Sequence, residues 1–156
     1  METIIRSIMT TIHDAITIDI TKIHDTRGNL SVIEGNAVPF EIKRVYYLYD
    51  VPSGAKRGGH SHINQQELLV ALSGSFDVIL NDGNEHKTVT LNKPNVGLLI
   101  VNGIWRELQN FSSGSVCLVL ASDVFEEEDY IRDFEDFKLS KNGSSQTDIR
   151  QKNFPF

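Results

Sequence analysis

The sequence predicts a single all-β domain, a double-sheet sandwich or barrel of short antiparallel strands with a short helix near its C-terminal end. Segments rich in β-branched residues recur along most of the chain, and clusters of Gly, Asn, Asp and Pro separate them at close, regular spacing. Apolar residues take up a helical spacing only after residue 124. With 156 residues, 40% hydrophobic and 23% charged, the chain is expected to form one domain, residues 1–156, with a core over about 16–138.

The first third of the chain predicts three strands. Residues 1–12 have no clear period and are expected to form a lead-in. Residues 15–23 alternate apolar and polar side chains and predict a half-buried strand, and a turn and a short strand over 30–34 follow. The tyrosine-rich segment 42–49 predicts a strong third strand, and the Gly- and Pro-containing segment 50–59 predicts a loop.

The rest of the chain predicts the remaining strands and one helix. An Asn-Asp-Gly-Asn turn is a strong hairpin signal between two of these strands. The strands are predicted over residues 66–72, 75–80, 86–91, 96–101, 104–111 and 116–121. Beyond them, Tyr130, Phe134 and Phe137 share one face of a helix predicted over 125–138, and residues 140–156 are expected to form a flexible tail.

Composition excludes several classes of function. The net charge of -6 argues against a general nucleic-acid binder, although local arginines could still bind a small anion. The one cysteine, Cys117, cannot form an internal disulfide and is expected to be a buried strand residue. Charged residues interrupt the first 23 positions, so we predict no signal peptide and no membrane span, and we expect a cytoplasmic protein.

The most informative stretch runs from Arg57 to Gly74. His60 and His62 stand one residue apart, so on a strand their side chains point to the same face. Together with Glu67 and Gly74 they form the pattern His-x-His-x4-Glu-x6-Gly. This pattern resembles the first motif of the cupin superfamily, whose fold is a jelly-roll barrel, also called a double-stranded β-helix. In many cupins the two histidines and the glutamate bind a metal.

A second position argues against a metal in this chain. A metal-binding cupin usually supplies a third histidine from a second motif, and the matching position here is Arg106. Arginine has no lone pair to offer a cation and stays positively charged at working pH. Two histidines and one carboxylate could still hold a metal, but we expect a pocket with no metal and no other cofactor.

Longer segments resemble the sugar 3,4-ketoisomerases, metal-free cupins that act on dTDP-4-keto-6-deoxyglucose. The resemblance covers about Asp25 to Lys138, most of the chain. The segments that carry it are DTRGNL (25–30), PFEIKRVYYLYD (39–50), RGGHSH (57–62), GSFDVILNDG (74–83) and LASDVFEEEDYIRDFEDF (120–137).

The resemblance implies an isomerase that moves the sugar carbonyl from C4 to C3 through an enediol. An aminotransferase would then use the product to make a dTDP-3-amino sugar, for surface polysaccharides such as the O-antigen of lipopolysaccharide or for glycosylated metabolites. By analogy His60 is the acid and base at carbon, and His62 shuttles protons between the oxygens. Neutral imidazoles, with a pKa of ~6.5, suit both tasks near neutral pH.

The resemblance also implies the other contacts of the substrate. It places Tyr46 in the catalytic site, and Arg44 shares a strand face with Tyr46 and is the first candidate to pair with the diphosphate. Arg27 and Arg106 would face the sugar. Glu67 would orient a histidine or pair with an arginine, and the sequence leaves this choice open.

Arg27 and Arg106 also mark a departure from the family. Two residue pairs at these positions are associated with the two configurations of the product at C4, gluco and galacto: tyrosine with arginine, and arginine with histidine. This chain has arginine at both positions and matches neither pair. Both configurations therefore stay open.

Three alternative functions compete with the ketoisomerase. A related metal-free dTDP-sugar 3,5-epimerase would use the same proton abstraction next to a ketone. A non-catalytic sugar-binding cupin would not need the paired histidines, and a metal-dependent oxygenase is disfavoured by Arg106. We also expect a homodimer in which residues 15–23 pair with the partner's sheet as an exchanged strand, since this would cover an exposed edge.

Overall fold

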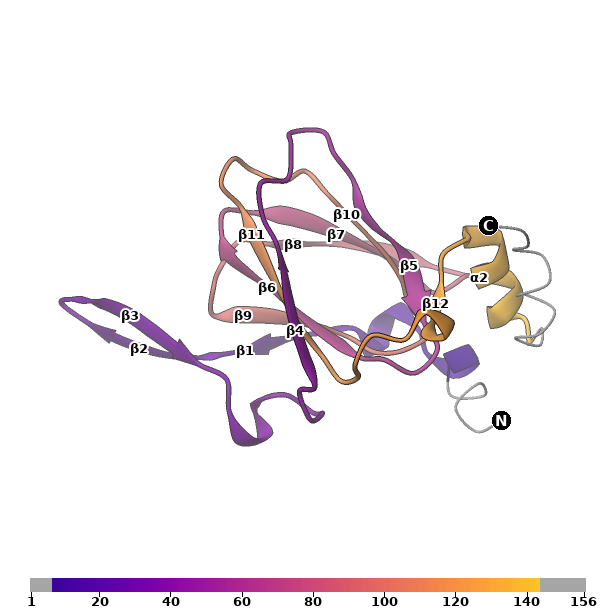
Figure 1. Ribbon diagram of the computed structural model, residues 1–156, viewed down its shortest axis with the longest axis horizontal. Coiled ribbons are helices and arrows are strands. Elements are labelled where there is room, and N and C mark those ends of the chain that lie inside the picture. Colours follow the sequence, from indigo (N-terminus) through magenta and orange to yellow (C-terminus); the bar gives the residue numbers. More distant parts are fainter. Residues whose placement is uncertain (1–6, 144–156) are drawn as a thin grey trace.

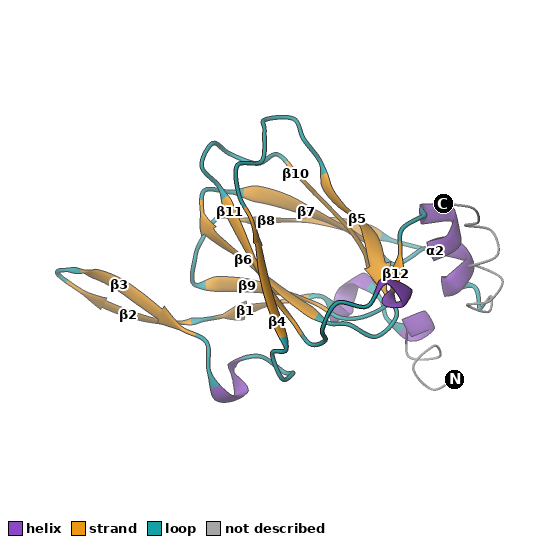
Figure 2. Ribbon diagram, in the orientation of Figure 1, coloured by secondary structure: helices purple, strands orange, loops and turns teal. Residues whose placement is uncertain are grey.

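The computed structural model describes residues 7–143 and confirms the all-β prediction (Figures 1 and 2). Two five-stranded sheets face each other. One sheet has the order β1 (Ile16–Asp19), β9 (Val96–Ile100), β6 (Glu67–Ser73), β11 (Val116–Ala121), β4 (Arg44–Leu48). The other has the order β12 (Tyr130–Ile131), β5 (Arg57–His62), β10 (Trp105–Gln109), β7 (Phe76–Asn81), β8 (His86–Leu91). The pairings between these strands are antiparallel, as in a jelly-roll barrel.

The apolar run in β6 is buried on both of its faces. Leu69 belongs to the main core between the sheets, whereas Leu68 and Val70 pack on the other face against Ile20 and Val38. The segment that connects the N-terminal strands to β4 therefore covers the outside of this sheet. Cover on both faces explains why the run is continuously apolar and does not alternate.

The predicted strand over 15–23 is divided in two. Its first half, β1, pairs with β9 of the same chain. Its second half, β2 (Thr21–Asp25), forms a hairpin with β3 (Gly28–Val32), and this hairpin projects away from the barrel (Figure 1). Every residue of β2 is exposed. Two short 3-10 helices, η1 (Ile12–Asp14) and η2 (Gly35–Ala37), flank this region, and residues 1–6 of the predicted lead-in lie outside the described residues.

The prediction of a helix over 125–138 is wrong in its first half. The segment begins with a 3-10 turn, η3 (Glu127–Asp129), and Tyr130 lies in β12, which pairs with β5. The helix α2 (Phe134–Lys141) starts only after Asp133, whose side chain caps it by accepting a hydrogen bond from the Asp136 N–H. Pairing with a strand outweighs the helical spacing because it satisfies the backbone of an otherwise uncovered edge.

Helix α2 closes one end of the barrel. Phe137 is fully buried and packs with Trp105 and Ile131. The predicted tail over 140–156 lies outside the described residues from position 144 onward. None of the described helices is long and apolar enough to cross a membrane.

Candidate active site

A cavity of about 310 Å³ opens between the two sheets. Strands β4, β5, β6, β10 and β11 contribute to its wall, and so do two residues at and after β12. Four arginines line it, namely Arg44, Arg57, Arg106 and Arg132, against a single acid, Glu67, among the described lining residues. The cavity is therefore positive although the whole chain is acidic, which suits a small anionic ligand.

His60 presents a free nitrogen to this cavity. Its Nε2 atom is buried and has no hydrogen-bond partner. Burial, and then the charge of Arg106, lower the pKa of His60 to about 2, so the imidazole is neutral at working pH. A buried nitrogen without a partner is costly for a fold to keep, and here it offers a ligand a lone pair or a proton.

A glycine brings His60 to its position. Gly58 in β5 has a φ of 83°, and a Cβ atom there would lie 3.0 Å from the Arg106 carbonyl oxygen. The register between β5 and β10 shifts at this point, as in a β-bulge. The predicted loop over 50–59 therefore ends early, because its two adjacent glycines already belong to β5.

His62 lies behind the cavity wall. Its side chain has no exposed surface and is not among the lining groups. The rings of His60 and His62 meet edge to face with 4.8 Å between centroids, and the Tyr130 ring packs against both, at 5.0 and 4.4 Å. The prediction that the two histidines share one face is thus confirmed, but they reach different depths.

Glu67 connects these groups. Its Oε1 accepts a hydrogen bond from Arg106 Nη1 at 2.5 Å, and its Oε2 accepts one from the Tyr46 hydroxyl at 2.6 Å. Burial alone would raise the pKa of Glu67, but contacts that include the charge of Arg106 and the hydrogen bond from Tyr46 outweigh burial and hold this pKa well below its usual range. Burial, and then the adjacent charge of Glu67, raise the pKa of Tyr46, which stays a phenol.

Arg44 and Tyr46 lie on one face of β4 and both point into the cavity, as predicted, whereas Tyr47 and Tyr49 face outward. The Arg44 guanidinium lies 4.9 Å from the centroid of the Tyr46 ring, and its Nη2 donates to the Tyr130 hydroxyl at 3.1 Å. Its Nε atom is buried without a partner. The geometry leaves this arginine with donor capacity for an anion at the cavity.

The residues present do not fit a metal ion. Potential ligand atoms of His60, His62 and Glu67 all lie within 4.8 Å of one another. However, both oxygens of Glu67 already accept hydrogen bonds, and one of these comes from the Arg106 guanidinium. A cation bound to this carboxylate would have to displace or face that positive charge. We therefore derive no chemistry through a metal.

Residues 13–142 match the protein family described as WxcM-like, C-terminal (FdtA). The chain belongs to this family. It is 48% identical over 122 residues to the TDP-4-oxo-6-deoxy-alpha-D-glucose-3,4-oxoisomerase of Aneurinibacillus thermoaerophilus, a match that covers 78% of this chain and 88% of that protein.

Two solved structures have the same architecture. A 3,4-ketoisomerase from Helicobacter canadensis is 42% identical, with a TM-score of 0.81 over 83% of this chain and 98% of that one. A mutant of the 3,4-ketoisomerase QdtA from Thermoanaerobacterium thermosaccharolyticum, in complex with TDP-4-keto-6-deoxyglucose, is 38% identical. Its TM-score is 0.83 over 85% of this chain and 97% of that one.

The fold of this FdtA-family chain brings together five of the predicted residues at the cavity and places two elsewhere. Those at the cavity are Arg44, Tyr46, His60, Glu67 and Arg106, and His62 lies directly behind them. Arg27 lies in the projecting hairpin, paired with Asp25 at 2.8 Å and highly exposed. The structure of one chain does not bring Arg27 to that chain's cavity.

Sequence reasoning missed four groups of this site. Arg57, Tyr130 and Arg132 line the cavity, and Asp129 contacts His62. The helix predicted over 125–138 hid three of them, since it made the acids look like a solvated helix start. Tyr130 and Arg132 both line the cavity. Their spacing of two residues is typical of one face of a strand, and this spacing could have indicated a strand here.

Proposed function

We propose that this protein is a sugar 3,4-ketoisomerase that converts dTDP-4-keto-6-deoxyglucose to a dTDP-3-keto-6-deoxyhexose. The observation that carries the proposal is the free, buried Nε2 of His60 in a cavity lined by four arginines. The relatives named as 3,4-oxoisomerase and 3,4-ketoisomerase support it. They favour this reaction over the 3,5-epimerase and over a non-catalytic sugar-binding protein.

In the proposed reaction, His60 Nε2 takes the proton from C3 of the bound 4-keto sugar. The electron pair of that bond forms the enediol, whose developing negative charge is stabilised by the arginines. The resulting imidazolium then returns its proton to C4, while a proton moves from one sugar oxygen to the other. No electron leaves the substrate, so the reaction needs no external oxidant or reductant.

His62 takes part in the oxygen-to-oxygen transfer through its neighbours. Tyr46 and Glu67 line the cavity and are joined at 2.6 Å, and Glu67 Oε1 lies 3.6 Å from His62 Nε2. This chain of contacts connects the fully buried imidazole with a bound sugar. Arg44 binds the diphosphate from β4, and Arg57 and Arg132 line the same cavity from the other sheet.

The decisive experiment follows metal-stripped protein and dTDP-4-keto-6-deoxyglucose in deuterated water by NMR. A ketone at C3 with deuterium at C4 supports the ketoisomerase, and the same spectra give the C4 configuration. Deuterium at C5 would indicate an epimerase, and binding without exchange would indicate a non-catalytic binder. His60→Asn should abolish exchange at C3, whereas the control His86→Asn, on the exposed side of β8, should leave it unchanged.

We also propose that the protein works as a homodimer. The projecting hairpin exposes Ile23 and Leu30, and the edge strand β4 exposes Val45 and Tyr47, so both surfaces are apolar and unpaired within one chain. Because β1 pairs with β9 of its own chain, the exchanged element would be the β2–β3 hairpin and not residues 15–23 as a whole. Exchange would carry Arg27 toward the partner's cavity.

Subunit mixing tests this arrangement. Arg27→Ala and His60→Asn chains should each have low activity alone, and their mixture after exchange of subunits should regain a site with both residues intact. A mixture of His60→Asn and His62→Asn chains is the control. It should regain no activity, because one chain supplies both histidines of a site and each site of a mixed dimer still lacks one of them. Sedimentation as a stable monomer, or no recovery in the first mixture, contradicts the proposal.

The product indicates which class of reaction follows this one. A ketone at C3 is the group that an aminotransferase converts to an amine, so the enzyme would supply a dTDP-3-amino-sugar route, as for O-antigen sugars, in the cytoplasm. A coupled assay with such an aminotransferase and an amino donor should yield the amino sugar. If no amination occurs after incubation with this protein, the proposed order of reactions is wrong.

A further inference from the structure

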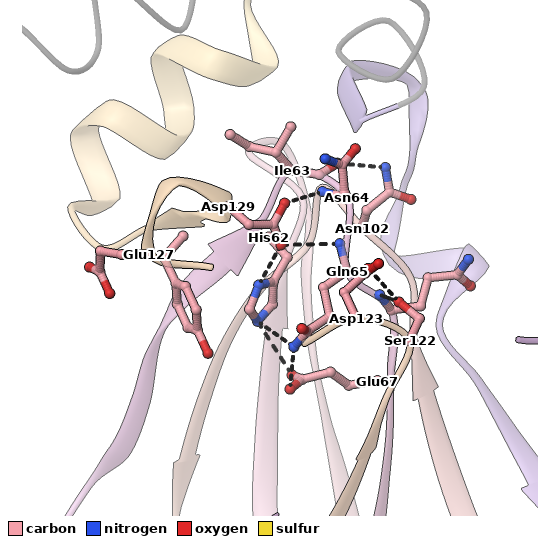
Figure 3. Close-up of polar contacts among 12 residues, drawn as sticks. His62, Ile63, Asn64, Gln65, Glu67, Asn102, Ser122, Asp123, Glu127 and Asp129 are labelled. Carbon is pink, nitrogen blue, oxygen red and sulfur yellow. Dashed lines mark hydrogen bonds and ion pairs between the residues drawn. The ribbon is translucent and has the colours of Figure 1, made fainter. Parts of the chain in front are cut away.

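Asp129 lies against the far side of His62 from Glu67 (Figure 3). Its Oδ2 is 3.0 Å from His62 Nδ1, while His62 Nε2 faces Glu67 Oε1 at 3.6 Å. The imidazole has no exposed surface and is therefore held between two carboxylates from distant parts of the chain. Asp129 does not line the cavity, and His62 is the group of the site that its side chain contacts.

The chain fixes the Asp129 carboxylate firmly. Its Oδ1 accepts a hydrogen bond from the Asn64 backbone N–H at 2.6 Å, and its Oδ2 accepts a second from the Gln65 backbone N–H at 3.1 Å. The Asp129 backbone carbonyl also accepts from the Ile63 N–H at 2.9 Å. These bonds hold the turn η3 on the loop that follows β5, so the carboxylate cannot rotate away from His62 without losing backbone partners.

This contact decides which ring nitrogen carries the hydrogen. An ionised carboxylate only accepts hydrogen bonds, so the His62 nitrogen that faces Asp129 must be the donor. The other nitrogen, Nε2, lies 3.6 Å from Glu67 Oε1, which is beyond hydrogen-bond distance, so in the neutral ring it keeps its lone pair. The Gln65 side chain agrees with this assignment, because its amide can give one hydrogen to Glu67 Oε2 at 3.0 Å and direct the other at His62 Nε2, 3.5 Å away.

We propose that Asp129 is a positioning residue of the isomerase: it holds His62 as the Nδ1–H tautomer, with the Nε2 lone pair directed at Glu67 and Gln65. The proposal rests on the proposed function, in which His62 relays protons through Glu67. Only this tautomer lets Nε2 accept a proton from the cavity side. The other tautomer would aim an N–H at Gln65 and a lone pair at Asp129.

Asp129→Asn tests the proposal at the level of the tautomer. An asparagine amide has one oxygen where the carboxylate has two; when that oxygen keeps the shortest contact, to the Asn64 N–H, the amide NH2 faces His62 Nδ1 and the contact to the Gln65 N–H is lost. An NH2 group donates, so His62 should switch to the Nε2–H form. Long-range proton–nitrogen correlation spectra of protein labelled with nitrogen-15 histidine distinguish the two forms, and the His62→Asn spectrum identifies the signals of His62.

Kinetics provide the second readout. In Asp129→Asn, kcat should fall by ~10²-fold or more, as expected for a misoriented acid–base group, while KM stays within about 2-fold because Asp129 does not touch the cavity. Glu126→Gln is the matched control, since it removes one negative charge from the same exposed loop beside η3. It should change neither the tautomer nor kcat.

The two readouts keep the outcomes separate. A wild-type His62 in the Nε2–H form overturns the proposal directly, also if Asp129→Asn does not fold. A folded Asp129→Asn protein also overturns the proposal if its kcat is unchanged, or if only its KM changes. If the wild-type protein does not isomerise the sugar, the proposed function fails, and the spectra alone still decide whether Asp129 sets the tautomer.

Discussion

Replacing Arg106 with methionine should destabilise the fold by about 3–5 kcal/mol near neutral pH, because it leaves the Glu67 carboxylate buried without its cation. Each side chain is 1% exposed, and their atoms meet at 2.5 Å. The variant also removes the bond that Arg106 Nη2 donates to the Ile104 carbonyl at 2.9 Å. Methionine keeps much of the apolar volume of the arginine stem, so lost packing is a smaller contribution.

The pH dependence of this loss is part of the prediction. In the wild-type protein the folded pKa of Glu67 lies below the unfolded value of ~4.3, so its ionisation stabilises the fold above that pH and this stability is lost as pH falls. Without Arg106, burial should prevail and place the folded pKa above the unfolded one. The difference in unfolding free energy between wild type and variant should therefore widen from pH 4 to pH 7.

Urea unfolding measures both effects. Trp105 is the single tryptophan and packs on Phe134 and Phe137 in the interior, so its fluorescence reports unfolding. All variants are compared at one protein concentration, since association would shift apparent stability. In a Glu67→Gln background, Arg106→Met should cost less by at least ~1.5 kcal/mol. An equal cost in both backgrounds, or a difference that narrows toward pH 7, would refute the reasoning.

Three further predictions follow from the same structure. Phe137→Ala should cost about 3–5 kcal/mol, because the ring is fully buried among aromatic neighbours, and thermal unfolding would reveal it. Burial, and then the charge of Arg106, hold the pKa of His60 at about 2 against ~6.5 when unfolded, so as pH falls only the unfolded chain gains this proton. Stability should drop by ~2 kcal/mol from pH 7 to pH 5 through this residue, and urea unfolding of His60→Asn should lack that part of the pH dependence. Arg44→Ala should raise KM more than it lowers kcat, since a diphosphate contact is similar in ground and transition states; steady-state kinetics with an unchanged KM would move that contact to another arginine.

Metal removal is a separate test. Because a guanidinium is bonded to the one carboxylate of the His60–His62–Glu67 group, activity should survive prolonged treatment with EDTA. Loss of activity that one divalent metal restores would show that Arg106 does not exclude a cation.

Local sequence pattern was sufficient to predict those strands whose bounds and faces depend only on alternation and on the flanking turns. The strands β8 and β11 begin and end at the predicted residues, because alternation and flanking turns determine them without reference to distant segments. The same alternation correctly turns Arg44 and Tyr46 inward and Tyr47 outward. The pairing of His60 with His62 followed from their spacing alone.

Local pattern and family resemblance therefore predicted an all-β barrel, the strand faces and five of the residues that line the cavity. The pairing of Glu67, the depth of each histidine and the positions of Asp129 and Tyr130 depend on contacts between segments more than 30 residues apart, and these contacts form only in the folded chain. The segment 127–131 lies within the helix predicted over 125–138, yet it forms a turn and a strand because β5 offers backbone hydrogen bonds to it. Such a choice depends on an edge that exists only after the barrel has formed, and no local pattern contains it.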